Sequence, residues 1–193
     1  RFISPDGKKV VYNSYLSGKE DIFIINIDGT NNVNLTGNLD GLDFNPGFSP
    51  DGSKVLFGSN ENGCCDIYIM NIDGTNQVNL TNNNTFYSND RFEFSPNNLT
   101  IIYTNSQNSN SSEQGIWSMD LNGNNKKQLS NGGYDSSVSS DGSKIVYLSE
   151  KQSSSGYDIF IMNIDGTNKI NLTNDDYFNT KPVFSPDGSK IVY

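Results

Sequence analysis

The candidate side chains for chemistry in this chain are its carboxylates, the oxygen ligands of its repeated turns and two thiols, and its 193 residues include no histidine. Without imidazole, neither a Ser-His-Asp nor a Cys-His nucleophile can be assembled, and metal sites built on histidine are excluded. Two carboxylates such as Asp43 and Asp90 could form a general acid–base pair, since burial can raise the pKa of a carboxyl group. No sequence feature singles out such a pair, and we expect neither catalysis nor a cofactor.

Two other groups could bind a metal. The segment Asn26-Ile-Asp28-Gly-Thr30 and its copies gather oxygen ligands, but their spacing is not that of an EF-hand loop, and Asp-Gly is a favoured turn sequence. The adjacent Cys64 and Cys65 could form a strained disulfide or bind a soft metal. Two free thiols at a strand start, one facing in and one out, fit strand alternation better. We therefore expect hairpin turns and no metal.

The net charge of the chain is -9, and many of its acidic residues fall in repeated turns. This balance argues against nucleic acid or an anionic membrane surface as a partner, since both require a basic face. No apolar run approaches the length of a transmembrane helix, and no segment has the pattern of a signal peptide. We expect no membrane insertion.

The candidate residues are set in a repeat. The last ten residues, Phe184-Ser-Pro-Asp-Gly-Ser-Lys-Ile-Val-Tyr193, have near-copies beginning at Ile3, Phe48, Phe94 and Val138. The turn positions recur every 44 to 46 residues, at Asp6, Asp51, Asn97, Asp141 and Asp187. A period in this range indicates a repeat architecture, so the fold is read one repeat at a time.

Each repeat contains four predicted strands and no helical pattern. After the Ser-Pro-Asp-Gly turn come a first strand, a variable loop, and a second strand that is apolar on both faces, such as residues 66–72. An Asp-Gly-Thr-Asn hairpin turn then leads to a strand that alternates apolar with polar residues, such as 78–81. A loop and a short strand complete the repeat. Short connections throughout predict an antiparallel four-stranded sheet, the blade of a β-propeller.

The repeat resembles that of TolB-type propellers. The shared pattern is Pro-x-Phe-Ser-Pro-Asp-Gly-Ser-Lys-Ile-Val-Tyr, then Asp-Ile-Phe-Ile-Met-Asn-Ile-Asp-Gly-Thr-Asn, then Asn-Leu-Thr, and it covers essentially the whole chain. The third repeat departs from it with Asn97-Asn98 in place of Asp-Gly, and the fourth with Ser140 in place of Pro. We predict one all-β propeller array over residues 1–193, with blades at 1–36, 44–81, 91–130 and 136–173 and an incomplete blade at 181–193.

The predicted blade count is about four and a half, and such a set does not close into a ring. The TolB resemblance implies a six-bladed ring, so the chain is expected to be part of a larger ring or to complete one with another copy. An open apolar sheet edge is prone to pair with another strand. We therefore predict self-association of the chain when it is expressed alone.

Strand parity places the two repeated turns at one face and the variable loops at the other, where binding residues are expected. Residues that precede the innermost strands should approach the mouth of the central channel: Asp43, Asn45, Asp90, Arg91, Asp135, Asn179 and Lys181. The same face carries aromatic candidates for anchoring a partner: Tyr15, Phe44, Phe86, Tyr87, Tyr134, Tyr157, Tyr177 and Phe178. A solvated rim explains the polar set equally well.

The leading functional hypothesis is a non-catalytic scaffold that binds a protein or peptide through this face. The TolB resemblance implies a bacterial envelope setting, in the periplasm or at the cell surface. One alternative is the gating propeller of a larger hydrolase or lyase, which a Gly-x-Ser-x-Gly elbow in a further domain would reveal. Another is a truncated or engineered repeat array that assembles with itself.

Overall fold

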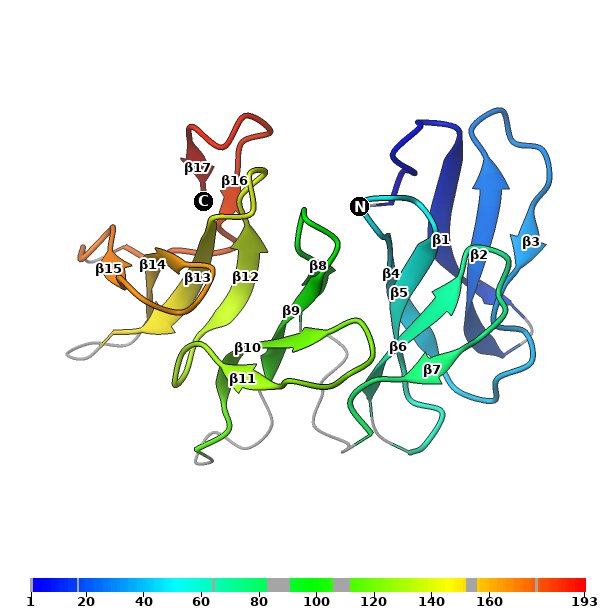
Figure 1. Ribbon diagram of the computed structural model, residues 1–193, viewed down its shortest axis with the longest axis horizontal. Helices are drawn as coiled ribbons and strands as arrows, with labels where there is room; N and C mark the ends of the chain where they lie inside the picture. Colours follow the sequence, from blue (N-terminus) through cyan, green and yellow to red (C-terminus); the bar gives the residue numbers. More distant parts are fainter. Residues whose placement is uncertain are drawn as a thin grey trace. The chain divides into compact units, whose positions relative to one another are not determined.

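The structure is a computed structural model that describes residues 2–16, 18–63, 65–82, 91–105, 112–151, 156–175 and 177–193 (Figure 1). Within these ranges the regular structure consists of seventeen β-strands, and no helix is present. The described part therefore also contains no helix that could span a membrane. The all-β prediction is confirmed.

The strands form five antiparallel sheets among the described residues. The first contains β1 (Lys9–Leu16), β2 (Lys19–Asn26) and β3 (Val33–Asn34), with Ile3 bridged to Val10. Three four-stranded sheets follow. The second sheet contains β4 (Asp43–Phe48), β5 (Lys54–Ser59), β6 (Asp66–Asn71) and β7 (Val78–Asn79), and the third contains β8 (Phe92–Phe94), β9 (Thr100–Asn105), β10 (Gly115–Asp120) and β11 (Lys127–Gln128). The fourth contains β12 (Tyr134–Val138), β13 (Lys144–Glu150), β14 (Tyr157–Asn163) and β15 (Ile170–Asn171). The last sheet pairs β16 (Val183–Phe184) with β17 (Ile191–Val192).

The chain divides into two compact units. One comprises residues 1–88 with 121–123 and holds the sheets of β1–β3 and β4–β7. The other comprises residues 89–120 and 124–193 and holds the remaining three sheets. Consecutive strands pair within each sheet in the order of the sequence, as expected for propeller blades.

The Ser-Pro-Asp-Gly turn is built from side-chain hydrogen bonds to its own backbone. In the fourth repeat, the Ser139 hydroxyl donates to Asp141 Oδ1 at 2.6 Å, and the Ser143 amide donates to the same oxygen at 3.0 Å. Gly142 has a φ of 72°, a conformation that glycine adopts without steric cost. Hydrogen bonds from Ser139 and Ser143 lower the pKa of Asp141 to about 2. The aspartate therefore shapes the turn, as the sequence predicts.

The Asp-Gly-Thr-Asn segments are hairpin turns, as predicted. The amide and hydroxyl of Thr30 donate to Asp28 Oδ1 at 3.0 and 2.6 Å, and Asn26 Nδ2 donates to Thr30 Oγ1 at 2.9 Å. Gly29 and Asn31 have φ angles of 83° and 53°. The oxygens proposed as possible calcium ligands thus hold the hairpin closed.

Each unit has its own apolar core. In the first unit, Phe57 and Tyr68 face each other across β5 and β6 with ring centroids 5.5 Å apart, inside a cluster that also includes Val11 and Ile22. In the second unit, fully buried Ile116, Ile145 and Met162 lie in a comparable cluster. These residues come from the predicted strands, whose β-branched and aromatic side chains suit packing on both faces.

The two kinds of connection lie at opposite ends of the sheets. The amide of Ile72, next to an Asp-Gly-Thr-Asn turn, donates to the carbonyl of Ser53 in a Ser-Pro-Asp-Gly turn at 3.2 Å. At the other end, Lys151 Nζ donates to the carbonyl of Tyr177 at 2.9 Å and so joins two variable loops. We call these the turn end and the loop end of each sheet. The predicted assignment of loops to faces holds at these contacts.

Candidate functional site

A bulge in the first strand of a sheet positions part of the predicted site. The register of β4 with β5 shifts between Phe44 and Gly47, and that of β12 with β13 shifts between Tyr134 and Ser137. Residues at one repeat position have left-handed φ angles of 51°, 48° and 47°, namely Asn45, Asp135 and Lys181. Asparagine and aspartate tolerate this conformation well, and a bulge turns a side chain away from the regular pleat.

The bulge brings two predicted residues together at the loop end of the second unit. Arg91 Nε lies 3.6 Å from Asp135 Oδ1, and their side chains are 39% and 30% exposed. An ion pair this exposed contributes little to stability, about 0–1 kcal/mol. Its effect is to place a cation and an anion side by side at the surface.

Three predicted aromatic residues are in contact in the same unit. The rings of Tyr134 and Tyr157 meet edge to face with centroids 5.6 Å apart, and those of Tyr157 and Phe178 do so at 6.2 Å. Phe178 is nevertheless 71% exposed, and the neighbouring Tyr177 is 77% exposed. We call Tyr134, Tyr157, Tyr177 and Phe178 the aromatic patch.

The inner part of the aromatic patch is held by polar contacts. Gln114 Nε2 donates a hydrogen bond to the hydroxyl of Tyr134. Burial, followed by the charge of Glu150, raises the pKa of Tyr134, so this phenol is neutral at pH 7. The patch therefore has a fixed, half-buried base in Tyr134 and Tyr157 and a solvent-exposed outer part in Tyr177 and Phe178.

The other predicted site residues are distributed differently. Tyr15 lies on β1 in the first unit, across from Glu20, and is 70% exposed. Three residues are buried and unavailable to a partner in this structure: Asp43, Phe44 and Asn179. The predictions for Phe86, Tyr87 and Asp90, like that for Cys64, lie outside the described residues.

Sequence reasoning missed a polar clasp that fastens the third strand of a sheet to its fourth, as between β6 and β7. The hydroxyl of Thr81 donates to Asp66 Oδ1 at 2.6 Å and accepts from the amide of Ile67 at 3.0 Å, while Asn79 Nδ2 donates to Asp66 Oδ2 at 2.9 Å. The equivalent residues Asp158, Asn171 and Thr173 make the same contacts. The sequence signal that could have revealed this clasp is an aspartate followed 13 and 15 residues later by Asn and Thr.

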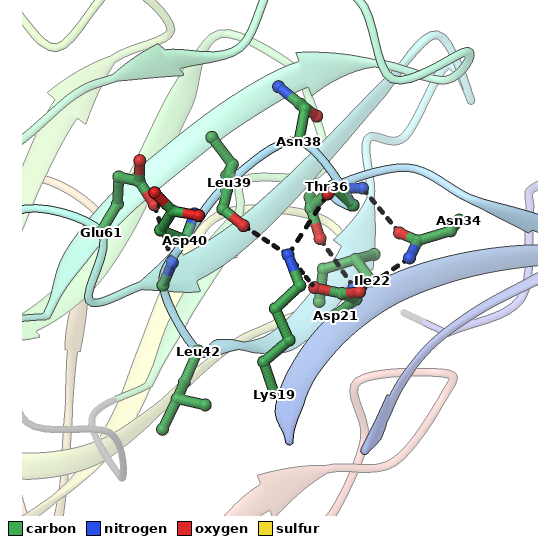
Figure 2. A network of polar contacts seen from close by, with 12 residues as sticks. Lys19, Asp21, Ile22, Asn34, Thr36, Asn38, Leu39, Asp40, Leu42 and Glu61 are labelled. Carbon is green, nitrogen blue, oxygen red and sulfur yellow. Dashed lines mark hydrogen bonds and ion pairs between the residues drawn. The ribbon is translucent and has the colours of Figure 1, made fainter. Parts of the chain in front are cut away.

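The clasp is incomplete in the first sheet, which Figure 2 shows from close by. Asn34 Nδ2 donates to Asp21 Oδ2 at 2.7 Å, and the amide of Ile22 donates to Thr36 Oγ1 at 2.9 Å. Asp21 Oδ1, however, is buried without a hydrogen bond. Lys19 Nζ approaches that oxygen at 3.4 Å and donates to the carbonyl of Leu39 at 2.5 Å.

Asp43 lies beside this incomplete clasp with no exposed surface. No donor of a described residue reaches either of its carboxylate oxygens in hydrogen-bond geometry, although the hydroxyls of Ser59 and Thr36 lie close by. Burial raises its pKa to about 6, against a smaller lowering by the nearby hydroxyls of Ser59 and Thr36, and the charges of Asp21 and Glu61 raise it further. Among the described residues, no three His, Cys, Asp or Glu side chains are grouped to hold a metal ion. Any cation here would need ligands of other kinds.

Comparison with known proteins supports the fold assignment. A family model described as the TolB beta propeller domain matches residues 1–158. Comparison with curated proteins gave no match. TolB from Acinetobacter baumannii is similar, with 26% sequence identity and a TM-score of 0.76 over 99% of this chain and 47% of that one. This chain thus spans about half the length of that TolB.

Two further solved structures share the fold. A second protein described as TolB, from Agrobacterium tumefaciens, is 24% identical with a TM-score of 0.70, over 96% of this chain and 69% of that one. A chain in a nidogen/laminin complex is 16% identical with a TM-score of 0.63, over 91% and 63%. The family model covers most of the sequence, and four-stranded antiparallel sheets repeat along it. The chain therefore belongs to the TolB beta propeller domain family.

Proposed function

We propose that this chain is a non-catalytic module that binds a protein or peptide through the aromatic patch. The observation that carries the proposal is the patch itself: Phe178 and Tyr177 are 71% and 77% exposed, yet Phe178 packs on Tyr157. Interface hot spots are enriched in aromatic residues that bury large areas at a low entropic cost. Tyr177 and Phe178 are exposed aromatic residues next to a packed aromatic base, as expected for an interface hot spot.

The surroundings of the patch suggest the chemistry of the partner. Arg91 and Asp135 lie together at the loop end, and Lys181 is exposed on the segment that follows Phe178. A rim with both signs of charge suits a segment that inserts apolar side chains and pairs polar groups around them. We therefore propose a peptide or protein segment with aromatic or aliphatic anchors.

Family membership supports a setting for this binding. The similarity to TolB from Acinetobacter baumannii favours the bacterial envelope, in the periplasm or at the cell surface, by resemblance. The likeness to a chain of a nidogen/laminin complex adds that this fold occurs in a protein–protein complex. Fold likeness alone does not assign a function, so the aromatic patch remains the basis of the proposal.

The test is a binding experiment with a matched control. The chain is used to capture proteins from envelope extract, and the recovered partner is purified and titrated against three proteins: the wild type, the double variant Tyr177→Ala and Phe178→Ala, and Leu99→Ala. Leu99 is 67% exposed at the turn end and serves as the control. We expect the double variant to raise Kd by about 30-fold, equivalent to about 2 kcal/mol, and Leu99→Ala to leave Kd unchanged. Equal affinities for all three would contradict the proposal.

A further inference from the structure

Among the described residues of the first unit, three buried carboxylate oxygens have no donor in hydrogen-bond geometry. Both oxygens of Asp43 and Oδ1 of Asp21 are buried and have no hydrogen bond. Asp43 has no exposed surface, and Asp21 is 3% exposed. A buried charge without a partner costs several kcal/mol, so native structures pair such groups with donors, water or cations.

The clasps of the second and fourth sheets differ from that of the first sheet, where Asp21 Oδ1 lacks a hydrogen bond. In the second and fourth sheets, the hydroxyls of Thr81 and Thr173 donate to the clasp aspartates at 2.6 and 3.1 Å. The hydroxyl of Thr36 makes no such bond to Asp21 Oδ1. It lies instead near enough to Asp43 to influence that carboxyl group. Three oxygen-bearing groups therefore converge where the other clasps have a closed pair.

The position of Asp43 in the repeat identifies what is missing. Counting back from Phe-Ser-Pro-Asp-Gly, Asp43 corresponds to Asn179 in the last repeat. The side-chain Nδ2 of Asn179 donates to the backbone carbonyl of Tyr157 at 3.1 Å and to Thr173 Oγ1 at 3.2 Å. At this point in the fold a donor thus sits among oxygen acceptors. At the same repeat position Asp43 has a carboxylate in place of the side-chain amide of Asn179, so a donor is replaced by an acceptor. A cation or additional hydrogen-bond donors are needed to balance the negative charge of Asp43.

Within the part of the chain that the structure describes, the charges near Asp43 do not supply this balance. Lys19 is the cation at the clasp, and Figure 2 shows its ammonium group between Asp21 and the carbonyl of Leu39. The carboxylate of Glu61 adds another negative charge, although it accepts bonds from the amides of Asp40 and Gly41 at 2.6 and 2.7 Å. Three carboxylates and one ammonium group leave an excess of negative charge around Asp43.

We propose that the junction of the first two sheets is a calcium site, with Asp43 and Asp21 as its charged ligands and the hydroxyls of Thr36 and Ser59 as neutral ones. Calcium accepts six to eight oxygen ligands in flexible geometry and tolerates hydroxyl, carbonyl and water oxygens. Magnesium demands a regular octahedron and fits such a mixed set less well. Because only two of the proposed ligands are carboxylates, we expect the weak affinity of extracellular modules, about 10⁻⁴–10⁻³ M.

The experiment uses the whole chain after treatment with chelator. Calcium binding is measured by isothermal titration calorimetry at pH 7.5, and the melting temperature is measured with and without calcium. We expect one saturable site in the wild type, a rise of several degrees in the melting temperature, and loss of both in Asp43→Asn. That variant carries the residue found at position 179 and should fold. Asp21→Asn provides a second ligand variant.

The matched control is Asp66→Asn, which alters a buried carboxylate whose hydrogen bonds are made within the protein. It should be less stable but should bind calcium as the wild type does. Two results would overturn the proposal: no calcium response in the wild type up to roughly 10 mM, or the same response in Asp43→Asn. A wild-type stability that depends on pH but not on calcium would also overturn it, since a proton on Asp43 would then supply the missing donor.

Discussion

Replacing Asp43 with asparagine is expected to stabilise the folded chain at pH 7.5 in the presence of chelator. In the folded state burial raises the pKa of Asp43 from 3.8 to about 6, with Asp21 and Glu61 adding to the effect. The charged carboxylate is therefore disfavoured in the folded state at neutral pH, whereas the unfolded chain solvates it fully. Asparagine removes the charge and supplies a donor for the oxygens nearby.

The magnitude follows from the size of the shift. A pKa shift of about 2 corresponds to about 3 kcal/mol, and because charges even at buried sites behave as if in a medium of fairly high effective dielectric constant, we expect about 1–2 kcal/mol. The direction in which this stability difference changes with pH follows from the linkage between protonation and folding. Well above pH 6 the penalty is fully present; as the pH falls below 6 the folded state takes up a proton and the penalty shrinks, and it vanishes only below the unfolded pKa of 3.8. The advantage of Asp43→Asn should therefore be largest at pH 7.5 and clearly reduced at pH 4.5.

The assay is urea denaturation of both proteins at the two pH values, followed by tyrosine and tryptophan fluorescence. Turn carboxylates such as Asp141, whose pKa is lowered to about 2, keep the same environment in both proteins and cancel in the difference. If Asp43→Asn is less stable than the wild type at pH 7.5, or if the difference is the same at both pH values, the account of this buried carboxylate is wrong.

Three further predictions concern the fold and its association. A Cβ at Gly58 would lie 2.3 Å from the ring of Phe44, so Gly58→Ala should lower the free energy of unfolding by about 1–3 kcal/mol; an unchanged urea midpoint would contradict the packing. Thr81→Val removes the bond to Asp66 and leaves a buried amide without its acceptor, and should cost about 2 kcal/mol in the same assay; a neutral effect would show that the clasp is not needed. Within the described residues β17 pairs only with β16, and its open edge should lead to self-association, so light scattering should give a mass above that of one chain that rises with concentration; a constant monomer mass would exclude it.

The sequence predicted the strands and turns well because their causes are local. Asp141 and Asp28 bond to backbone groups two residues away, and such contacts can be inferred from residue type and spacing alone. The alternation of apolar residues then orders the strands between the turns. Because the repeat period is nearly constant, the strands and turns assigned in one repeat can be assigned at the equivalent positions of the others.

The site was less predictable because burial and contact depend on packing between elements. Asp43 and Asn179 share one repeat position and were both expected near the surface, yet adjacent strands and loops cover them. The bulge that turns Asp135 toward Arg91 requires a left-handed residue, and this requirement is visible only in the backbone. The aromatic residues could be assigned to the loop end, but their mutual contacts could not.

The claim that the loop end binds the partner is tested most directly by amide hydrogen exchange with and without the captured protein. We predict protection at residues 134–135 and 177–181, around the aromatic patch, with unchanged exchange at the turn end around residues 96–99. Protection at the turn end, with no change around the aromatic patch, would contradict it.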